Sequence, residues 1–371
     1  MNFDLSEDEE MLKALAERFV TDNYDFESRR TFLAEANGYS QTNWALLGEL
    51  GLIGAMFDEK DGGLDLGATG IATIFEALGR GLVVEPLIEN VLLAGRLFAS
   101  CADQDLRDAW LPGILTGEQR IALANTEIHG RPGLLWTETA ARIDGAGYRL
   151  SGIKTCVPAG AGAGAYIVVA RTHGAPDDAD GAALFFVPAD SPGIKTENWR
   201  MTDGSMAAWL TLDDVAVAES QRLNGGWAAV EAAEDFANLA RAAEALGIME
   251  RSFAETLEYL NTREQFGVKL GSFQALQHRM ATQYAVLEQC RGLLHLALIS
   301  HGSDRFTSAV QGLRAFVGPA SITLSQEMVQ MHGGMGVTDE LSIGHAHKRL
   351  LTLSRWPDSP EIALNRYANT V

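Results

Sequence analysis

The sequence predicts a mostly helical α+β protein in which a region of short strands separates two helical regions. Apolar residues recur at helical spacing through residues 1–118 and again through residues 227–371. Residues 119–226 instead contain short β-rich runs between clusters of Gly, Pro and Asp. We therefore expect an N-terminal helical domain over 1–118, a middle β-barrel-like domain over 119–226 and a C-terminal helical bundle over 227–371.

In the N-terminal region, Ser6 precedes the segment EDEEMLKALAERF, whose acidic first turn predicts the start of a helix. Further amphipathic or apolar helices are expected over Trp44–Leu52, Ile71–Leu82 and Pro86–Ala99. After these helices, Pro112 and Gly113 are expected to mark the boundary of the N-terminal helical region.

The middle region begins with a hairpin signal, because two β-rich runs, 139–143 and 148–150, flank the turn Asp144–Gly147. Three further runs are short and bounded by turn residues: Tyr166–Arg171, Ala183–Pro188 and Ala208–Leu212. Several short strands at this spacing are typical of a small barrel or sandwich.

The C-terminal region predicts three long helices, over 232–262, 273–300 and 306–331. Long helices with short connections favour an up-and-down bundle.

The composition of the chain excludes several classes of function. The 371-residue chain carries a formal net charge of −20, which argues against nucleic acid as a partner because a phosphate backbone requires a basic face. The N-terminal segment is acidic where a signal peptide would be basic, and no apolar run approaches the ~20 residues of a membrane span. Cys101, Cys156 and Cys290 lack metal-type spacing. We expect a cytoplasmic protein with reduced thiols, no metal and no membrane attachment.

Two segments carry residues suited to a nucleotide. In NTREQFGVKLGSFQALQ, Arg263 lies at a predicted helix end, where a guanidinium can bind a diphosphate in bidentate fashion. Gln274 and Gln277 follow a Gly-Ser turn and can hydrogen-bond a purine edge. Each of these residues, taken alone, also fits an ordinary exposed position.

The second segment, QMHGGMG over Gln330–Gly336, ends a predicted helix with three glycines. Glycine permits positive φ and a close approach of backbone to ligand. The alternative is a helix C-cap followed by a loop. Because a helix precedes the glycines, the segment is neither a Walker loop nor a strand-bound dinucleotide motif.

Taken together, these segments resemble the acyl-CoA dehydrogenase family. TREQFG followed by FQALQ, and the helix ending in QMHGGMG, are similar to its two C-terminal signatures. LGLIG, GGL and EALG resemble its N-terminal pattern, and ANTE, GIK and PADSPGIK its middle domain. The resemblance extends, in order, over essentially the whole chain.

The resemblance implies a C-terminal four-helix bundle, assembly as a dimer of dimers, and FAD with its ring between the middle and C-terminal domains. It implies that the adenine-diphosphate half of each FAD is held by the neighbouring subunit. Carried over to this chain, that half falls on Arg263, Gln265, Phe266, Gln274, Gln330, Gly333 and Gly334. Thr126 is implied as a contact to the flavin ring.

The implied reaction is the α,β-dehydrogenation of an acyl-CoA thioester. A carboxylate removes the α-proton while the β-hydrogen leaves as hydride to the flavin. An acceptor similar to electron-transfer flavoprotein then takes the electrons.

The chain departs from the family pattern at the chemistry. One usual position of the base is Pro357 here, and the adjacent Asp358 is the candidate catalytic residue, with a turn or cap role as the alternative. The other usual position is Ala237, followed by Asn238. Three other acids lie near it on the helix but not at that position: Glu234, Asp235 and Glu244.

The expected flavin-ring wall also differs. A Trp-Ile-Thr-like trio is replaced by Cys156-Val-Pro158, and a serine expected to help bind the CoA ester is missing. His129 and Arg131 are either contacts to CoA phosphates or surface residues.

Residues donated to a neighbour are thus kept, whereas residues for the chain's own catalysis are changed. This pattern resembles the second subunits of heterotetrameric acyl-CoA dehydrogenases that act on steroid side chains or on dicarboxylic (pimeloyl-type) acyl-CoAs. We expect a chain that completes the FAD site of a paralogous partner. The alternatives are a self-sufficient homotetramer with Asp358 as base, a flavin oxidase, and a redox-inactive CoA-binding protein on the same fold.

Overall fold

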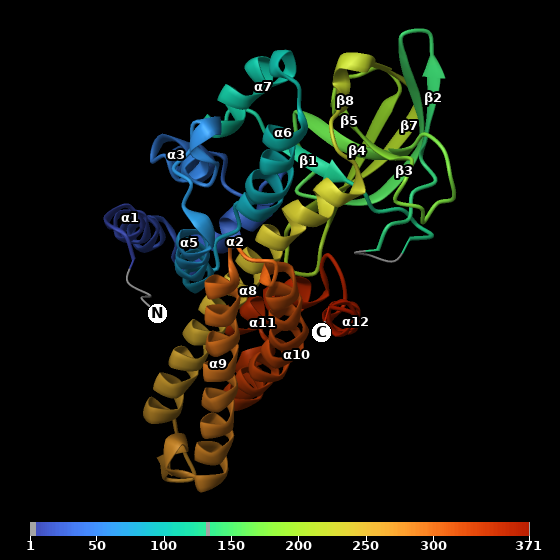
Figure 1. The fold of residues 1–371 in the computed structure, drawn as a ribbon. Coiled ribbons are helices and arrows are strands. Elements are labelled where there is room, and N and C mark those ends of the chain that lie inside the picture. Colours follow the sequence, from blue (N-terminus) through green and yellow to red (C-terminus); the bar gives the residue numbers. More distant parts are fainter. Residues whose placement is uncertain (1–4, 131–133, 371) are drawn as a thin grey trace. The chain divides into compact units, whose positions relative to one another are not determined.

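The computed structural model describes residues 5–130 and 134–370, and it confirms the predicted class: helices, then a sheet, then helices (Figure 1). The N-terminal helices are α1 (Glu7–Asn23), α2 (Phe26–Ala34), α3 (Gln41–Glu49), α4 (Leu52–Ala55), η1 (Glu59–Asp61), α5 (Gly67–Gly81), the π-helix η2 (Ile88–Gly95), α6 (Arg96–Cys101) and α7 (Gln104–Thr116). The strands of the middle region are β1 (Ile121–Ala124), β2 (Ala140–Asp144), β3 (Gly147–Pro158), β4 (Ala165–Arg171), β5 (Ala182–Pro188), β6 (Ile194–Arg200), β7 (Met206–Ala218) and β8 (Arg222–Leu223), with η3 (Glu219–Gln221) before the last.

The C-terminal region contains three long helices and two shorter ones. They are α8 (Trp227–Thr262), α9 (Gln274–Ser300), α10 (Phe306–His332), α11 (Ser342–Arg355) and α12 (Pro360–Ala368). Between them lie β9 (Glu264–Gln265), β10 (Val268–Lys269), η4 (Leu270–Ser272) and η5 (Gly333–Val337). Within the described residues, no helix is long and apolar enough to cross a membrane.

The contacts divide the chain into two compact units. One contains the segment up to Arg29, Gly67–Val83, and the chain from Asn238 onward; the other contains Arg30–Leu66 and Val84–Ala237. The first unit therefore combines α1 and α5 with the C-terminal helices. The predicted domain boundaries at 118/119 and 226/227 remain predictions.

The first unit begins with a capping box. The Ser6 hydroxyl accepts from the Glu9 backbone N–H at 3.2 Å, and the Ser6 N–H donates to Glu9 Oε2 at 2.8 Å. This satisfies two backbone groups that a helix start leaves without partners. The helix predicted from Ser6 therefore begins where its sequence signal lies.

Glycines bring α5 and α8 into close contact in the same unit. A Cβ on Gly247 would lie 2.2 Å from the Glu76 carbonyl oxygen, and one on Gly79 would lie 2.3 Å from that of Glu244. Any larger side chain at either position would push the helices apart.

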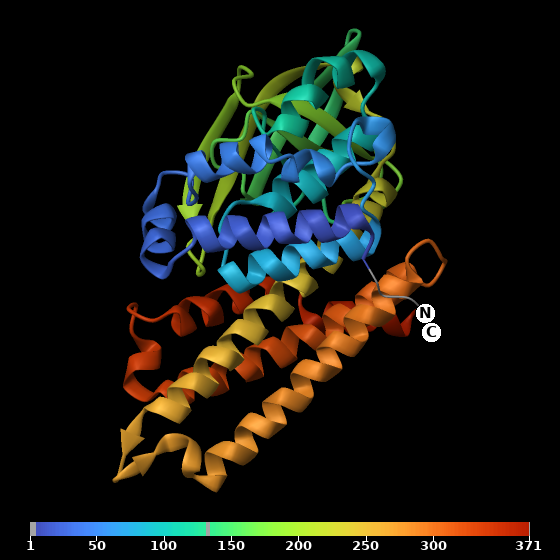
Figure 2. The same cartoon turned by 90° about the vertical axis from the view of Figure 1, so that its left-hand side faces the viewer.

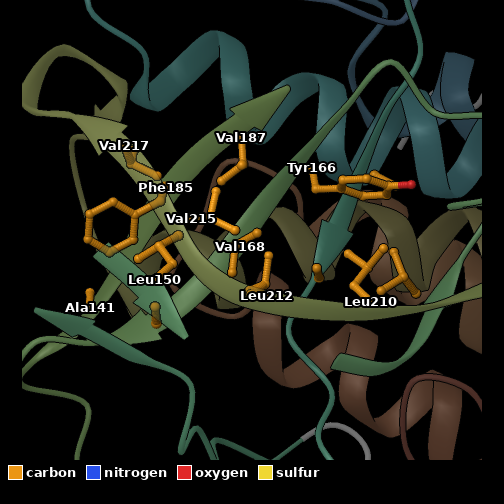
Figure 3. Packing of buried hydrophobic residues seen from close by; sticks show 14 of the residues in the cluster. Ala141, Leu150, Tyr166, Val168, Phe185, Val187, Leu210, Leu212, Val215 and Val217 are labelled. Carbon is orange, nitrogen blue, oxygen red and sulfur yellow. The ribbon is translucent and has the colours of Figure 1, made fainter. Parts of the chain in front are cut away.

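The second unit is built around one sheet with strand order β6-β7-β3-β2-β4-β5-β8, and β1 pairs in parallel with β4. Its apolar side chains form a buried core that includes Leu150, Val168, Phe185, Leu210 and Val217 (Figure 3). The predicted hairpin is confirmed, because Asp144 pairs with Gly147.

Three strands of this sheet, β1, β6 and β8, were not predicted from the sequence. β1 has only four residues and is buried throughout, so it shows no alternation. β6 is an edge strand whose side chains are almost all exposed, so it shows no apolar face. β8 has only two residues, too few for any pattern.

The long helices of the C-terminal region agree closely with prediction, although α8 begins at Trp227, five residues before the expected start. α10 packs against α9, α11 and α12. The β9–β10 hairpin connects α8 to α9 and lies at one end of the bundle (Figure 2).

Candidate cofactor and active site

The β9–β10 hairpin presents an aromatic ring to solvent. Phe266 has φ 59° and Gly267 has φ 80°, the left-handed pair of a two-residue hairpin turn. A bulky residue at positive φ is uncommon and indicates strain retained at a functional position. The Phe266 side chain is 89% exposed, and its ring centroid lies 6.3 Å from that of Phe273. The turn therefore leaves the Phe266 ring accessible from solvent.

Arg263 is held by its backbone and free to act through its side chain. Its N–H donates to the Tyr259 carbonyl at 2.8 Å, and its carbonyl accepts from the Leu270 N–H at 2.9 Å. The residue itself is exposed. A guanidinium presented in this way suits a diphosphate.

Two glutamines of this segment donate their side-chain amides to nearby backbone carbonyls. Gln265 donates its side-chain amide to the Glu264 carbonyl at 2.9 Å, and Gln277 donates to the Gly271 carbonyl at 2.8 Å. The amide of Gln277 therefore fixes its own turn. Gln274 is the exposed first residue of α9, where backbone N–H groups favour negative charge.

The second predicted segment forms an open turn at the end of α10. Gly333 has φ 61° and ψ −140°, a conformation that strongly favours glycine. A Cβ on Gly333 or Gly334 would meet no atom within 4 Å. Gln330 is exposed, one turn before. The Gly333 N–H also donates to the Gln330 carbonyl, so the turn caps the C-terminus of α10 and at the same time exposes backbone that no side chain covers.

The structure brings these two segments together. The Tyr259 ring, one turn before Arg263, stacks on the His332 ring with centroids 4.4 Å apart and planes 23° apart. His332 directly precedes Gly333. The arginine and the glycine turn therefore share one end of the bundle.

The expected ring wall lies in the other unit. Thr126 pairs with Cys156 in a β-bridge, the Thr155 N–H donates to the Thr126 carbonyl at 2.9 Å, and the Thr126 hydroxyl donates to Asn125 Oδ1 at 3.3 Å. Burial, together with the nearby Glu89 carboxylate, raises the pKa of the Cys156 thiol to about 12. The thiol is therefore neutral and unreactive at physiological pH.

A buried ion pair supports this wall. Glu127 Oε1 accepts from Lys154 Nζ at 2.6 Å and from the hydroxyls of Thr137 and Thr139 at 2.8 and 2.6 Å. Burial alone would raise the pKa of Glu127, but the Lys154 charge and these hydrogen bonds hold it below its ordinary value. Burial lowers the pKa of Lys154 to about 8. Both residues lie in motifs noted from the sequence, which gave no sign of their pairing.

The candidate base is enclosed by positive charge. Asp358 is 0% exposed, with Oδ1 3.1 Å from Arg314 Nη2 and Oδ2 2.9 Å from Arg366 Nη1. A cavity of about 10 Å³ lined by Arg241, Arg314 and Ser354 leaves room for about one water molecule. This geometry favours a structural anchor, and the base role of Asp358 remains a prediction.

The second base position holds no acid. Ala237 and Asn238 are fully buried, and Asn238 Oδ1 accepts from Arg241 at 2.9 Å. Glu244 forms a bidentate pair with Arg349, at 2.6 and 2.9 Å. Of the two other acids noted on this helix, Glu234 is half-buried and Asp235 is buried. Of the two residues expected either to contact CoA phosphates or to lie at the surface, His129 is exposed and Arg131 lies outside the described residues.

Comparison with known families agrees with the resemblance in the sequence. The N-terminal, middle and C-terminal domains of acyl-CoA dehydrogenase match residues 6–118, 122–215 and 224–371. The chain belongs to the acyl-CoA dehydrogenase family.

Three similar proteins illustrate this membership. Acyl-CoA dehydrogenase FadE27 of Mycobacterium tuberculosis is 28% identical, over 91% of this chain and 90% of its own length. A chain of the Tcur3481–Tcur3483 steroid acyl-CoA dehydrogenase is 30% identical, with TM-score 0.87 over 98% of this chain and 97% of that one. A chain of the ChsE4–ChsE5 complex of Mycobacterium tuberculosis is 26% identical, with TM-score 0.87 over 100% and 98%.

FAD is the cofactor of this dehydrogenase family. The exposed Arg263, the exposed Phe266 ring and the open Gly333–Gly334 turn fit its diphosphate and adenine. Two groups of side chains were not recognised from the sequence: Tyr259 and His332, whose rings stack, and Arg241, Arg314 and Arg366, which contact Asn238 or Asp358. The Tyr259–His332 and Arg314–Asp358 contacts join residues far apart in the sequence, and the contacts of Arg241 and Arg366 follow no recognised motif.

Proposed function

We propose that this chain is the assisting subunit of a heteromeric, FAD-dependent acyl-CoA dehydrogenase. Its bundle end, with Arg263, Phe266 and Gly333, completes an FAD site whose ring and catalytic base belong to a paralogous partner. The substrate is a bulky acyl-CoA thioester, and an electron-transfer flavoprotein-like acceptor takes the electrons.

One contrast carries this proposal. The cofactor-binding end is open and exposed, whereas neither base position offers a mobile acid: one is Pro357 and the other is the buried Ala237. The nearest alternative, Asp358, is pinned between two guanidinium groups. Two similar structures are complexes of two different chains, and one of these is described as a steroid acyl-CoA dehydrogenase.

The chemistry divides accordingly between the subunits. FAD supplies the acceptor for hydride. This chain supplies fixed positive charge and bare backbone at the diphosphate and adenine, which hold the cofactor in place without taking part in proton transfer. The proton acceptor then has to come from the partner.

The test is flavin stoichiometry. The chain expressed alone should purify without substantial FAD and without acyl-CoA turnover. Co-expressed in equal amounts with its paralogous partner, it should give about one FAD for every two chains, because each partner chain holds one flavin ring and this chain holds none. Full FAD occupancy and turnover by the chain alone would refute the proposal.

A variant makes the test residue-specific. Arg263→Met in this chain should lower the flavin content of the assembled heteromer. Arg279→Met is the matched control, because Arg279 pairs with Glu327 at 2.6 Å and belongs to neither segment. Equal flavin loss in both variants would show that Arg263 acts only through general stability.

A further inference from the structure

We propose that the Tyr259–His332 ring stack is a positioning contact, which holds the two cofactor-binding segments of this chain at one spacing so that they bind a single diphosphate-purine ligand. The inference rests on the proposed function only in taking FAD as that ligand. It assigns a positioning role to two side chains that are not among the residues predicted to bind the cofactor.

The stack joins two helices that end at the same place. Tyr259 lies on the last turn of α8, and His332 is the last residue of α10. Their ring centroids are 4.4 Å apart and their planes 23° apart, which is a stacked and not an edge-to-face arrangement. Tyr259 is half-buried and His332 is 7% exposed, so the contact is shielded from water.

The histidine ring is fixed in orientation as well as position. His332 Nδ1 lies 2.9 Å from the Met328 carbonyl oxygen, which can only accept. Nδ1 therefore carries a proton, and the ring cannot turn without breaking this bond. The stacking face presented to Tyr259 is set by α10 itself.

Each ring is tied to one cofactor-binding segment through the backbone. The Tyr259 carbonyl accepts the Arg263 N–H at 2.8 Å, and the Arg263 carbonyl accepts the Leu270 N–H at the base of the hairpin. His332 is bonded covalently to Gly333, whose φ 61° and ψ −140° set the direction of the turn. A change in the ring spacing therefore moves the arginine relative to the glycine turn.

A second aromatic pair shows what a merely structural contact looks like. Phe253 on α8 and Tyr284 on α9 have ring centroids 6.0 Å apart, tilted by 44°. Neither residue adjoins Arg263 or Gly333. Loss of this pair should affect stability without changing the geometry of the cofactor-binding end.

The experiment compares four variants in whichever assembly retains FAD: Tyr259→Leu, His332→Leu, Tyr259→Phe and Tyr284→Leu. FAD affinity is measured by flavin fluorescence on reconstitution of the apo-assembly, and ADP competition isolates the adenine-diphosphate half. Thermal unfolding of each apo-assembly reports stability. These readouts do not require turnover.

Tyr259→Leu should weaken both FAD and ADP by about five- to tenfold, in line with the loss of one aromatic pair. Tyr259→Phe should stay within about twofold of the parent because it keeps the stack, and Tyr284→Leu should do so because Tyr284 is 53% exposed and adjoins neither Arg263 nor Gly333. His332→Leu removes the other ring of the stack and should weaken FAD and ADP binding as much as Tyr259→Leu does. The test therefore remains possible if one of the two variants fails to fold.

The inference would be overturned if Tyr259→Leu bound FAD and ADP as tightly as Tyr284→Leu does. It would also be overturned if Tyr259→Phe bound them as weakly as Tyr259→Leu does. Failure of the proposed function shows differently, as full FAD binding and turnover by this chain alone. In that case the same variants still test the stack in the homomeric assembly.

Discussion

Replacing Asp358 with Asn separates a structural anchor from a catalytic base. The carboxylate is 0% exposed, and its two oxygens lie 3.1 and 2.9 Å from guanidinium nitrogens of Arg314 and Arg366. The Arg314 side chain is only 5% exposed, so neutralising its partner leaves a buried charge without full compensation. Breaking a buried pair from one side costs about 3–5 kcal/mol.

The amide that Asp358→Asn introduces retains one oxygen that can still accept from a guanidinium, so we expect a loss of about 3 kcal/mol in the free energy of unfolding. This is a large fraction of the roughly 5–15 kcal/mol typical of a folded protein. The loss is measured by urea unfolding of the purified assembly. Turnover per folded molecule is measured on the same samples below the unfolding transition.

Glu244→Gln provides the control, because Glu244 forms a comparable pair with Arg349 and is 5% exposed. Both variants should lose stability to a similar extent and keep turnover per folded molecule. A structural role for Asp358 would be refuted if the free energy of unfolding of Asp358→Asn lay within about 1 kcal/mol of the parent's while its turnover disappeared, since breaking a buried pair costs more than that. That result would establish Asp358 as a base.

Three further changes test other parts of the structure. Burial and the neighbouring Glu250 raise the pKa of Glu76 to about 7, so the folded state keeps a proton that the unfolded state releases above its ordinary value of 4.5. The free energy of unfolding should therefore fall as pH rises from 4.5 to 7, and Glu76→Gln should remove this fall, by roughly 2–3 kcal/mol, in urea titrations at pH 5 and 8. Because folding lowers the pKa of Glu127, ionised Glu127 stabilises the folded state above pH 4.5, and this stabilisation is lost as pH falls through its folded-state pKa. Glu127→Gln should therefore weaken the loss of stability at acid pH and lower the free energy of unfolding by about 3 kcal/mol at pH 7 in the same assay. Gly333→Ala should lower the free energy of unfolding by about 1–2 kcal/mol, because alanine is strained at φ 61°, and should also weaken FAD binding. An unchanged melting temperature would contradict this prediction.

The first helix, the three long C-terminal helices and one hairpin followed from the sequence because their signals are local. Helices α2, α7, α11 and α12 were not predicted, and the boundary expected at Pro112 and Gly113 lies inside α7. The Ser6 capping box lies within four residues, and the apolar spacing of α9 and α10 repeats along each helix. Residues 144–147 form the predicted turn. Strand β6 escaped prediction because an exposed edge strand has no apolar face to detect.

The candidate site was predictable only in part. Arg263 and Gly333 carry their own local signals, a helix end and a glycine turn. The partners of Asp358 do not, since Arg314 lies 44 residues away and no residue pattern connects the two. Pairing at such separation is set by how α10 packs against the chain that follows it, and a single sequence does not encode that packing in a readable motif.

A base that abstracts an α-proton has to reach the substrate, and this requirement separates the two halves of the chain's chemistry. Asp358 cannot leave its position without breaking contacts to two guanidinium groups at once, and Ala237 offers no acid to replace it. Binding of a diphosphate makes no such demand. It needs fixed charge and open backbone at a surface, and Arg263 and Gly333 provide both whichever chain holds the flavin ring. The proposed role of this end of the bundle toward a neighbour's cofactor therefore does not require Asp358 to move from its two arginine partners.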